Sequence, residues 1–341
     1  MHRFKWSFVG VASAALLAAA VGRAGHAAAN PGSPPVTTVV ALDPAAGELP
    51  ESITSDGHGN LYFSLVSGSV RRINPDHSVV QIATVPLPAG ASLTGIKVGP
   101  DGFIYACSDS FSPTPDGAFV WRISPATGAV TQFASLDANG FPNDLAFTDD
   151  GTLFVTDPFL GVLWKIDGAG HATVFLSDPL LAGNPAAPAF AVHPFGVDGI
   201  AFAKGGHELV VSNVDFGRVM RIDLDDEAPR VRVLVEDLRL QGVDGIAIDR
   251  RGTIYAAVNT QNRIATVDKH GRIEILAEGS PPFDSPASFA FGTAGNDKKT
   301  LYVANFAIVN VLGGQPAHPG IVSLPVQTPG LPLIGDEIDD D

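Results

Sequence analysis

Four polar residues occupy the same place in four copies of a repeated sequence pattern, and their side chains could bind a divalent cation. The hexapeptide GVDGIA occurs at 196–201 and again at 242–247, and four related stretches share its order of polar residue, apolar anchor, turn and β-rich run. The polar residues lie two positions before the anchors: Glu51, Asn143, Asp198 and Asp244. Oxygen ligands without His or Cys suit Ca²⁺ first, with Mg²⁺, Mn²⁺ or Zn²⁺ as alternatives.

Each of these residues also has a simpler interpretation when it is taken alone. Asp-Gly before a strand is common turn chemistry, and Asn143 after Pro142 is typical of a turn as well. The shared register favours the cation, because turns do not require oxygens at one repeated position. If the repeats bring these positions together, their like-charged carboxylates also need a cation or protons to compensate them.

The elements that position these residues follow from the repeat itself. Each copy predicts a strand, a tight hairpin and a second strand, usually followed by a third and a fourth. The apolar anchors recur about every 43–55 residues, the length of a propeller blade, and they are Ile53, Ile96, Leu145, Ile200, Ile246 and Phe289. We therefore predict an all-β fold, a six-bladed β-propeller with four-stranded blades.

The sixth copy lacks a fourth strand, and a spare strand precedes the first copy at Val36–Leu42. We expect this N-terminal strand to complete the last blade and close the ring, which removes an open sheet edge. An open β-sandwich or two β domains are the alternative, but sandwiches do not show a regular repeat of this length.

The chain ends suggest three regions. A basic start, an apolar run from Phe8 to Val21 and small residues at Ala27–Ala29 predict a signal peptide over 1–29. A membrane anchor is the alternative, although the run is short for a span. The propeller is expected over 30–327 and a flexible acidic tail over 328–341. The mature protein would be exported, either periplasmic or secreted.

Charge narrows the partners. The formal net charge is −15, and removing the three cationic residues of the leader brings it to −18. An acidic chain disfavours nucleic acid and anionic membrane surfaces as partners. We expect a monomer that acts on a small molecule. Cys107 is the only cysteine, so no internal disulfide can form.

Long loops before the inner strands supply candidate substrate contacts. Thr94 occupies the metal-ligand position of the second copy, and His193 lies five residues before Asp198. His193 is either a proton shuttle or substrate contact, or a loop histidine without a role. Phenylalanines cluster in the same loops, among them Phe141 and Phe195, and they predict an apolar mouth over the cation. Packing over the blades is the alternative for each of them.

The motifs resemble the SMP-30/gluconolactonase/LRE-like family of six-bladed propellers, whose relatives include paraoxonases and diisopropyl-fluorophosphatases. Glu51 in "PESI", Asn143 in "PNDLAF" and Asp244 in "VDGIAIDRRGTIYAA" match that family's metal-binding Glu, Asn and Asp. The resemblance implies a bound divalent metal, commonly Ca²⁺, and a role for Asp244 as base or nucleophile. Asp198 departs from the pattern, since the family usually has Asn there.

Together these features predict a metal-dependent hydrolase of a lactone or ester with an apolar part. Glu51, Asn143, Asp198 and Asp244 would hold the cation, and Asp244 or Asp198 would activate water or attack directly. The alternative is a non-catalytic propeller that binds a ligand or a protein and whose metal, if present, is structural, since NHL-repeat proteins share the blade pattern. A lyase or isomerase is a third candidate, because one fold hosts many chemistries.

Overall fold

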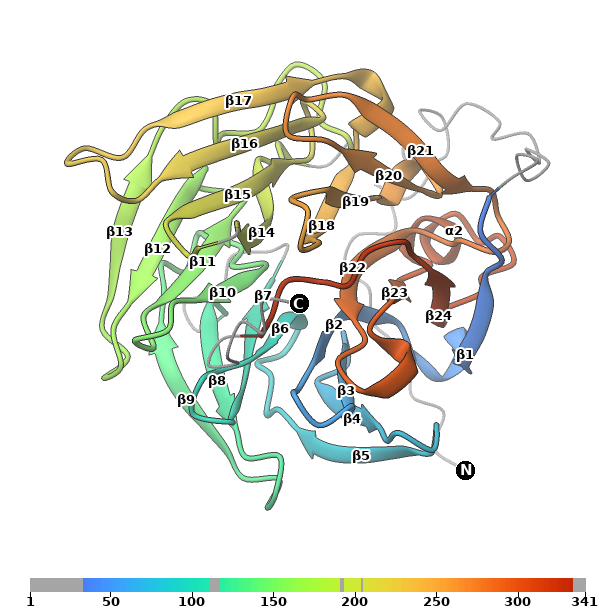
Figure 1. Cartoon of the computed structure of the whole chain (residues 1–341). Coiled ribbons are helices and arrows are strands. Elements are labelled where there is room, and N and C mark those ends of the chain that lie inside the picture. Colours follow the sequence, from blue (N-terminus) through green and yellow to red (C-terminus); the bar gives the residue numbers. More distant parts are fainter. Residues whose placement is uncertain (1–32, 111–116, 191–192, 204, 334–341) are drawn as a thin grey trace.

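The computed structural model describes residues 33–110, 117–190, 193–203 and 205–333. Six antiparallel sheets of four strands each surround a central channel (Figure 1). The predicted six-bladed propeller is therefore confirmed. The expected signal peptide lies outside the described residues. No helix within the described part of the chain is both long and apolar enough to cross a membrane.

In five blades the strands follow chain order outward from the channel, and in the sixth the outer strand is β1. The inner strands are β2 (Pro50–Ser55), β6 (Ser92–Val98), β10 (Leu145–Phe147), β14 (Val197–Phe202), β18 (Val243–Ile248) and β22 (Pro286–Phe291). The second strands are β3 (Leu61–Leu65), β7 (Ile104–Asp109), β11 (Leu153–Asp157), β15 (Glu208–Asn213), β19 (Ile254–Val258) and β23 (Thr300–Asn305). The third strands are β4 (Ser69–Ile73), β8 (Phe119–Ile123), β12 (Val162–Ile166), β16 (Arg218–Asp223), β20 (Arg263–Val267) and β24 (Gly320–Pro325). The outer strands are β5 (Val79–Thr84), β9 (Val130–Ser135), β13 (Ala172–Ser177), β17 (Val231–Glu236), β21 (Ile273–Glu278) and β1 (Thr37–Ala41).

The ring closes as the sequence predicted. β1 pairs antiparallel with β24, so the first strand of the chain supplies the outer strand of the last blade. The described loops contain short helices. Four are 3₁₀ helices, at Pro44–Ala46, Leu238–Leu240, Asn259–Gln261 and Gly295–Asp297, and the α-helix α2 spans Ile308–Leu312. Pairing both ends of the chain in one sheet leaves no unpaired edge between the first and last blades.

The hydrophobic core lies between neighbouring blades and not within one sheet. Val210 and Val219 of blade four pack against Val243 and Ile246 of blade five, and similar clusters fill the other blade interfaces. The second strands are covered on both faces, which explains their nearly continuous apolar sequences. Cys107 of β7 is fully buried in such a cluster.

A recurring β-bulge marks the start of the inner strands. In blades one, two, four, five and six the pairing of the inner and second strands shifts register there. In blade three, β10 begins only at Leu145, and the Asn143 amide donates to the carbonyl oxygen of Thr156 at 2.9 Å. A bulge bends a strand and redirects its side chains. We call the residues two before the six apolar anchors the inner ring, and they are Glu51, Thr94, Asn143, Asp198, Asp244 and Ala287.

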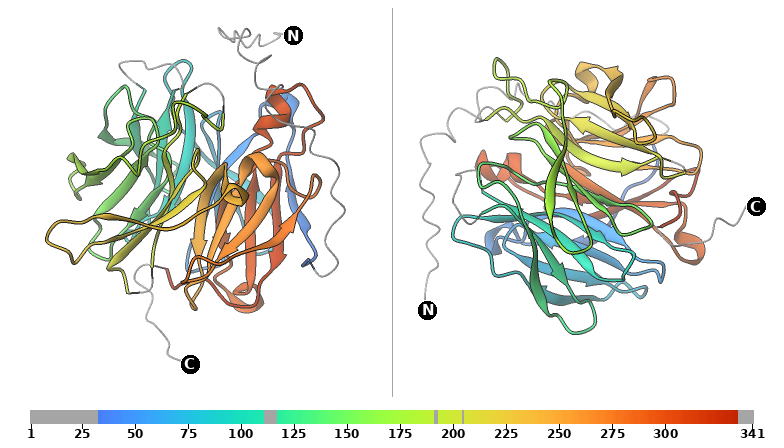
Figure 2. Two further views of the ribbon diagram at one scale, coloured as in Figure 1. Left: turned by 90° about the horizontal axis from the view of Figure 1, so that it is seen from above. Right: turned by 90° about the vertical axis from the view of Figure 1, so that its left-hand side faces the viewer.

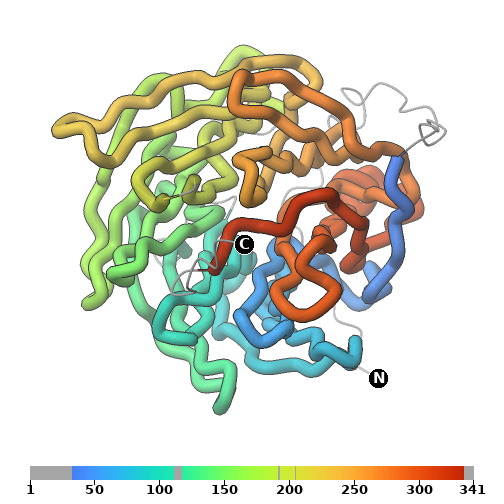
Figure 3. Tube along the Cα trace, in the orientation of Figure 1, coloured from blue at the N-terminus to red at the C-terminus, as the bar shows by residue number. Residues whose placement is uncertain are grey.

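The two faces of the propeller carry different elements. Helix α2 lies on one face, and the described C-terminal end of the chain lies on the opposite face (Figure 2). The last described residues cross from the sixth blade to the mouth of the channel (Figure 3). The Arg250 amide donates to the carbonyl of Pro329, and the Leu331 amide donates to the carbonyl of Ile248, both at 3.0 Å. Residues 328–333, which were expected to begin a flexible tail, are therefore tied to blade five, while 334–341 lie outside the described residues.

Candidate metal centre

The inner ring brings the predicted ligands to one end of the channel. Glu51, Asn143 and Asp198 are buried, with 6%, 5% and 1% of their surface exposed, and Asp244 is partly buried. A cavity of about 10 Å³ lies between Glu51, Asn143 and Asp244. That is roughly the room of one water-sized sphere. The shared register therefore does place residues from blades one, three and five around one small space.

Glu51 is the residue whose chemistry is least satisfied by the protein itself. Its Oε2 is fully buried and has no hydrogen-bond partner. An unpaired buried carboxylate costs several kcal/mol unless it is neutralised or bound by a cation. Burial raises the pKa of Glu51 well above its ordinary value, and the negative charges of Asp244 and Asp198 raise it further. The residue is therefore suited to a cation ligand and poorly suited to a purely structural role.

Asn143 and Asp198 form a pair across blades three and four. The Asn143 side-chain nitrogen donates a hydrogen bond to Oδ1 of Asp198. Burial and then the charges of Asp244 and Asp144 raise the pKa of Asp198, and the Asn143 hydrogen bond opposes that rise. Asn143 lines the small cavity, but Asp198 does not belong to its lining. Asp198 thus lies beside the cavity and orients Asn143 toward it.

The Asp244 carboxylate is fixed by a hydrogen bond from a residue at the end of the second strand of its own blade. Asn259, which follows β19, donates from its side-chain nitrogen to Oδ2 of Asp244 at 3.0 Å. Burial raises the pKa of Asp244 to about 8, although the Asn259 hydrogen bond lowers it, and the Asp144 charge adds to the rise. A carboxylate with a pKa near neutrality can hold or release a proton at physiological pH.

Thr94 is supported in an equivalent way by Asp109. The Thr94 hydroxyl donates to Oδ2 of Asp109 at 3.2 Å and lies 3.0 Å from the carbonyl oxygen of Pro142. Asp109 and Asn259 occupy equivalent positions at the end of the second strands of blades two and five. Each forms a hydrogen bond with the inner-ring residue of its own blade. Asp109 is fully buried, and its Oδ1 has no partner. Sequence reasoning missed Asp109 because the repeat was aligned on the inner strands alone.

Asp144 is a second carboxylate that sequence reasoning missed. It lines the small cavity, and its Oδ1 and Oδ2 accept from the amides of Leu145 and Ile200 at 2.8 and 3.1 Å. Burial raises the pKa of Asp144, and the positive charge of Lys97 lowers it. The signal was present in the repeat, because the same position in the other five copies holds only small residues: Ser52, Gly95, Gly199, Gly245 and Ser288.

The glycines at that position are required by the close approach of neighbouring blades. A Cβ on Gly199 would lie 2.5 Å from the carbonyl oxygen of Asp244, and one on Gly245 would lie 2.5 Å from that of Ala287. Neither glycine has a positive φ. The second glycine of GVDGIA therefore serves close packing of inner strands and not a turn.

The arrangement fits a hard divalent cation better than a soft one. The donors that surround the cavity are carboxylate and amide oxygens, without His or Cys. Within the described part of the chain, however, no three His, Cys, Asp or Glu side chains converge closely enough to form a ready metal site. A cation here would rely on the buried oxygen of Glu51 and on the Asn143 amide oxygen as well as Asp244. The ion itself stays a prediction.

The loop phenylalanines form one apolar cluster on the same face. Phe141 and Phe195 are 3% and 4% exposed and pack with Val214, so their rings lie beneath the surface. Phe159 is partly exposed and stacks on His193, with ring centroids 4.1 Å apart. His193 is exposed, and its Nδ1 lies 2.8 Å from the carbonyl oxygen of Pro194. Contact of Thr94, His193, Phe141 or Phe195 with substrate stays a prediction. Phe159 and His193 are more exposed than Phe141 and Phe195.

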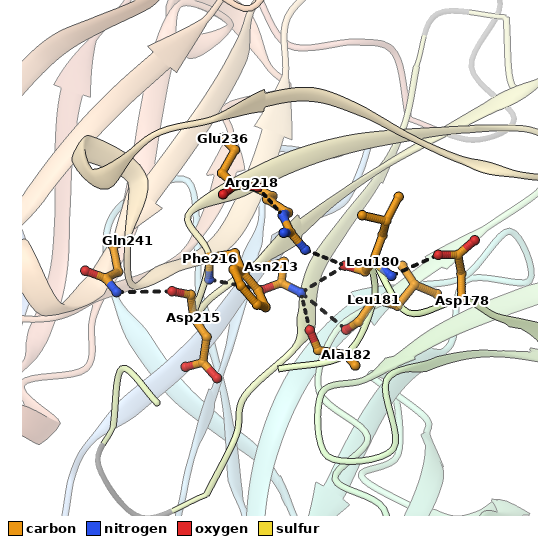
Figure 4. Close-up of polar contacts among 10 residues, drawn as sticks. All are labelled: Asp178, Leu180, Leu181, Ala182, Asn213, Asp215, Phe216, Arg218, Glu236 and Gln241. Carbon is orange, nitrogen blue, oxygen red and sulfur yellow. Dashed lines mark hydrogen bonds and ion pairs between the residues drawn. The ribbon is translucent and has the colours of Figure 1, made fainter. Parts of the chain in front are cut away.

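The long loop that carries His193 is tied down by polar side chains of blade four (Figure 4). The Asn213 side-chain nitrogen donates to the carbonyls of residues 180–182, and Arg218 pairs with Glu236 at 2.6 Å. Asp215 is 1% exposed and accepts from the amides of Asn184, Ala189 and Phe195 at 2.6–2.8 Å. The described parts of this loop, 178–190 and 193–196, are therefore bonded to blade four at several points.

Several solved structures share this fold at low sequence identity. Regucalcin, a calcium-binding protein from Agrobacterium tumefaciens, matches with a TM-score of 0.61 and 18% identity over 88% of this chain and 98% of that chain. A gluconolactonase from Xanthomonas campestris matches at 0.58 and 16% over 86% and 89%. Virginiamycin B lyase from Staphylococcus aureus matches at 0.57 and 14% over 86% and 99%. These identities show the fold alone, and a comparison with curated proteins finds no match.

A family model spans most of the propeller. The model described as SMP-30/Gluconolactonase/LRE-like region matches residues 49–306. That stretch contains the whole inner ring, from Glu51 to Ala287, and it ends just after β23. The match covers well over half of the chain and includes the positions that carried the resemblance in the sequence. The chain belongs to the SMP-30/gluconolactonase/LRE-like family.

Proposed function

We propose that the protein is a divalent-cation-dependent hydrolase of lactones or esters, with Ca²⁺ as the cation. The observation that carries the proposal is the buried Glu51 carboxylate, whose Oε2 has no partner and which faces a small cavity shared with Asn143 and Asp244. The family of the chain supports lactonase-type chemistry. A cation of this kind would polarise the substrate carbonyl and stabilise the developing oxyanion.

The residues of the chain would divide the remaining work. Glu51 and Asn143 supply oxygen ligands, and Asp198 orients Asn143 through its side-chain nitrogen. Asp244 acts as the general base that takes the proton of the attacking water, because it lines the cavity and Asn259 fixes its carboxylate. The Phe159 ring and His193 border the same face and would contact the apolar part of the substrate.

We also propose export to the periplasm or the medium as a monomer, after removal of residues 1–29. The apolar run and the small residues before Asn30 support this. N-terminal sequencing of the protein recovered outside the cytoplasm should begin near Asn30. A mature chain that keeps Met1 would contradict the proposal.

The function is tested with a panel of lactones and aryl esters that have apolar substituents. We expect chelation by EDTA to abolish hydrolysis and Ca²⁺ to restore it. Asp244→Asn should lower kcat at least about a hundredfold, which is the usual size of a lost general base. Asp225→Asn is the matched control, because Asp225 is exposed and does not line the cavity, and it should leave kcat within about twofold of the parent. Hydrolysis that survives both EDTA and Asp244→Asn would contradict the proposal.

A non-catalytic binding role is the second candidate, and the position of Asp198 favours it. Asp198 stands where the family usually has Asn, and it lies beside the cavity and not in its lining. The cation would then be structural and the loop-rich face would bind a ligand. A rise in Tm with Ca²⁺ together with no hydrolysis of any panel member would support this role.

A further inference from the structure

A second and much larger hollow lies at the other end of the channel. The candidate metal centre is built from the first residues of the inner strands, whereas this hollow is lined by their last residues, such as Thr54, Ser55 and Lys97. Its volume is about 480 Å³. That size is typical of pockets for small organic molecules. The pocket, which we call the lower pocket, shares no lining residue with the small cavity.

The charge of the lower pocket is opposite to that of the protein. Three cationic residues line it, Lys97, Arg250 and Lys298, and no Asp or Glu does, although the chain has a net charge of −15. Eight other arginines form ion pairs with carboxylates. The three pocket cations form no ion pair with any residue that the structure describes. Unpaired cations gathered in a concave site attract an anion.

Three phenylalanine rings form part of the wall of the lower pocket. Phe202 and Phe289 line it from blades four and six, and Phe291 lines it beside them. The hydroxyls of Thr54 and Ser55 supply polar groups near Lys97. Aromatic rings beside convergent polar groups suit a ligand that has both an apolar body and a polar head.

The C-terminal segment completes the pocket. Residues 329–333 form one wall, and Leu331 packs against the core of blade five. Gly330 pairs with Asp249, and a Cβ on Gly330 would lie 2.4 Å from the Phe291 ring. The segment therefore passes as close to Phe291 as a glycine allows, and it narrows the pocket to a defined shape.

We propose that the lower pocket is a binding site for a small amphipathic organic anion, with a carboxylate or sulfonate head and an apolar body. The head would lie among Lys97, Arg250 and Lys298, and the body would lie against Phe202, Phe289 and Phe291. This site is separate from the proposed hydrolytic centre, and binding is read directly, so failure of one proposal leaves the other standing.

Fluorescence titration with two probes tests the proposal. The first is 1-anilinonaphthalene-8-sulfonate, and the second is N-phenyl-1-naphthylamine, which has the same rings without the sulfonate. We expect the sulfonate to bind the full mature chain at one site, at least about tenfold more tightly than the uncharged amine. Octanoate should displace it, and octanol should not. Binding should weaken as salt concentration rises.

Paired variants locate the probe. Arg250→Gln with Lys298→Gln should weaken binding about tenfold or more. Arg251→Gln with Lys299→Gln is the matched control, since these exposed neighbours carry the same charge but do not line the pocket, and it should leave Kd within about twofold. Equal effects of the two double variants, or equal affinity for the two probes, would overturn the proposal.

A variant that lacks residues 334–341 tells apart two possible occupants of the lower pocket, a small anionic ligand and the acidic end of the chain itself. We expect the shortened protein to bind the sulfonate with a Kd within about threefold of the full chain. Binding that appears only after the removal would overturn the proposal, because the acidic end itself would then be the occupant of the pocket.

Discussion

At the scale of the residue, Glu51 carries the strongest functional signal in the molecule. Its carboxylate is buried beside other acids and gains no hydrogen bond at Oε2. Natural proteins keep such a group only where something else compensates it. Asp244, by contrast, is held by Asn259, so its environment sets its basicity as well as its position.

Glu51→Gln should therefore weaken cation binding without lowering the thermal stability of the cation-free protein. Without added cation, we expect its Tm to equal or exceed that of the parent, because a buried carboxyl group that repels its acidic neighbours when ionised is replaced by a neutral amide. Cation affinity should fall about tenfold, which is ~1.4 kcal/mol. Differential scanning fluorimetry with EDTA and with Ca²⁺ measures both effects.

Glu48→Gln is the control for that measurement, since Glu48 pairs with Arg71 at 2.6 Å outside the channel. It should leave the Ca²⁺-induced rise in Tm unchanged. A Glu51→Gln protein that is less stable in EDTA and keeps the full Ca²⁺ response would contradict a ligand role for Glu51.

At the scale of the element, the inner strand decides the geometry of the site. The bulge turns the polar side chain toward the channel, and the small residue after it lets the next blade approach. The serines of the second strands join this arrangement: the Ser212 hydroxyl accepts from the Gly199 amide and donates to the Asp244 carbonyl, at 2.7 and 2.8 Å. Blade four therefore helps to position Asp244 of blade five.

Gly245→Ala should expose this constraint. Its new Cβ would meet the Ala287 carbonyl at 2.5 Å, so the strands must separate. We expect a loss of about 1–3 kcal/mol in the free energy of unfolding, as for other overpacked sites. Urea unfolding measures it. Gly168→Ala is the matched control, because nothing lies within 4 Å of that Cβ, and its change should stay within about 0.5 kcal/mol. Equal losses in the two variants would contradict the close-packing role.

At the scale of the whole molecule, the ring concentrates acids from several blades in a protein that is already acidic. Burial and mutual repulsion raise the pKa values of Glu51, Asp198 and Asp244, the last to about 8. A carboxyl group whose pKa is raised by folding stabilises the folded state below its unfolded pKa, near 4. That contribution is lost as the pH rises through the folded pKa.

In EDTA, the Tm of the parent protein should therefore fall as the pH rises from about 5 to 8. The fall should be larger than that of Asp244→Asn over the same range. With Ca²⁺ the trend should reverse, because cation binding requires deprotonated carboxylates. Tm measured across this pH range with and without Ca²⁺ checks the prediction. Parallel pH profiles in the two conditions would show that the acids of the ring do not share a cation.

Much of the fold was predictable from the sequence. A blade is built from hairpins, so its pattern is local, and six copies with a regular period predicted the propeller and its closure by the N-terminal strand. The common register also predicted that Glu51, Asn143 and Asp244 would meet at one end of the channel, because equivalent positions of a closed ring face its axis.

Contacts between blades were decided only by the tertiary structure. Local alternation does not reveal that Asp144 borders the cavity, that Asp198 lies beside it, or that Gly199 and Gly245 serve strand approach. The lower pocket has the same origin, since Lys97, Arg250 and Lys298 come from three blades and are far apart in the chain. The period of the sequence sets each blade, whereas the distance between blades sets the chemistry of the channel that they enclose.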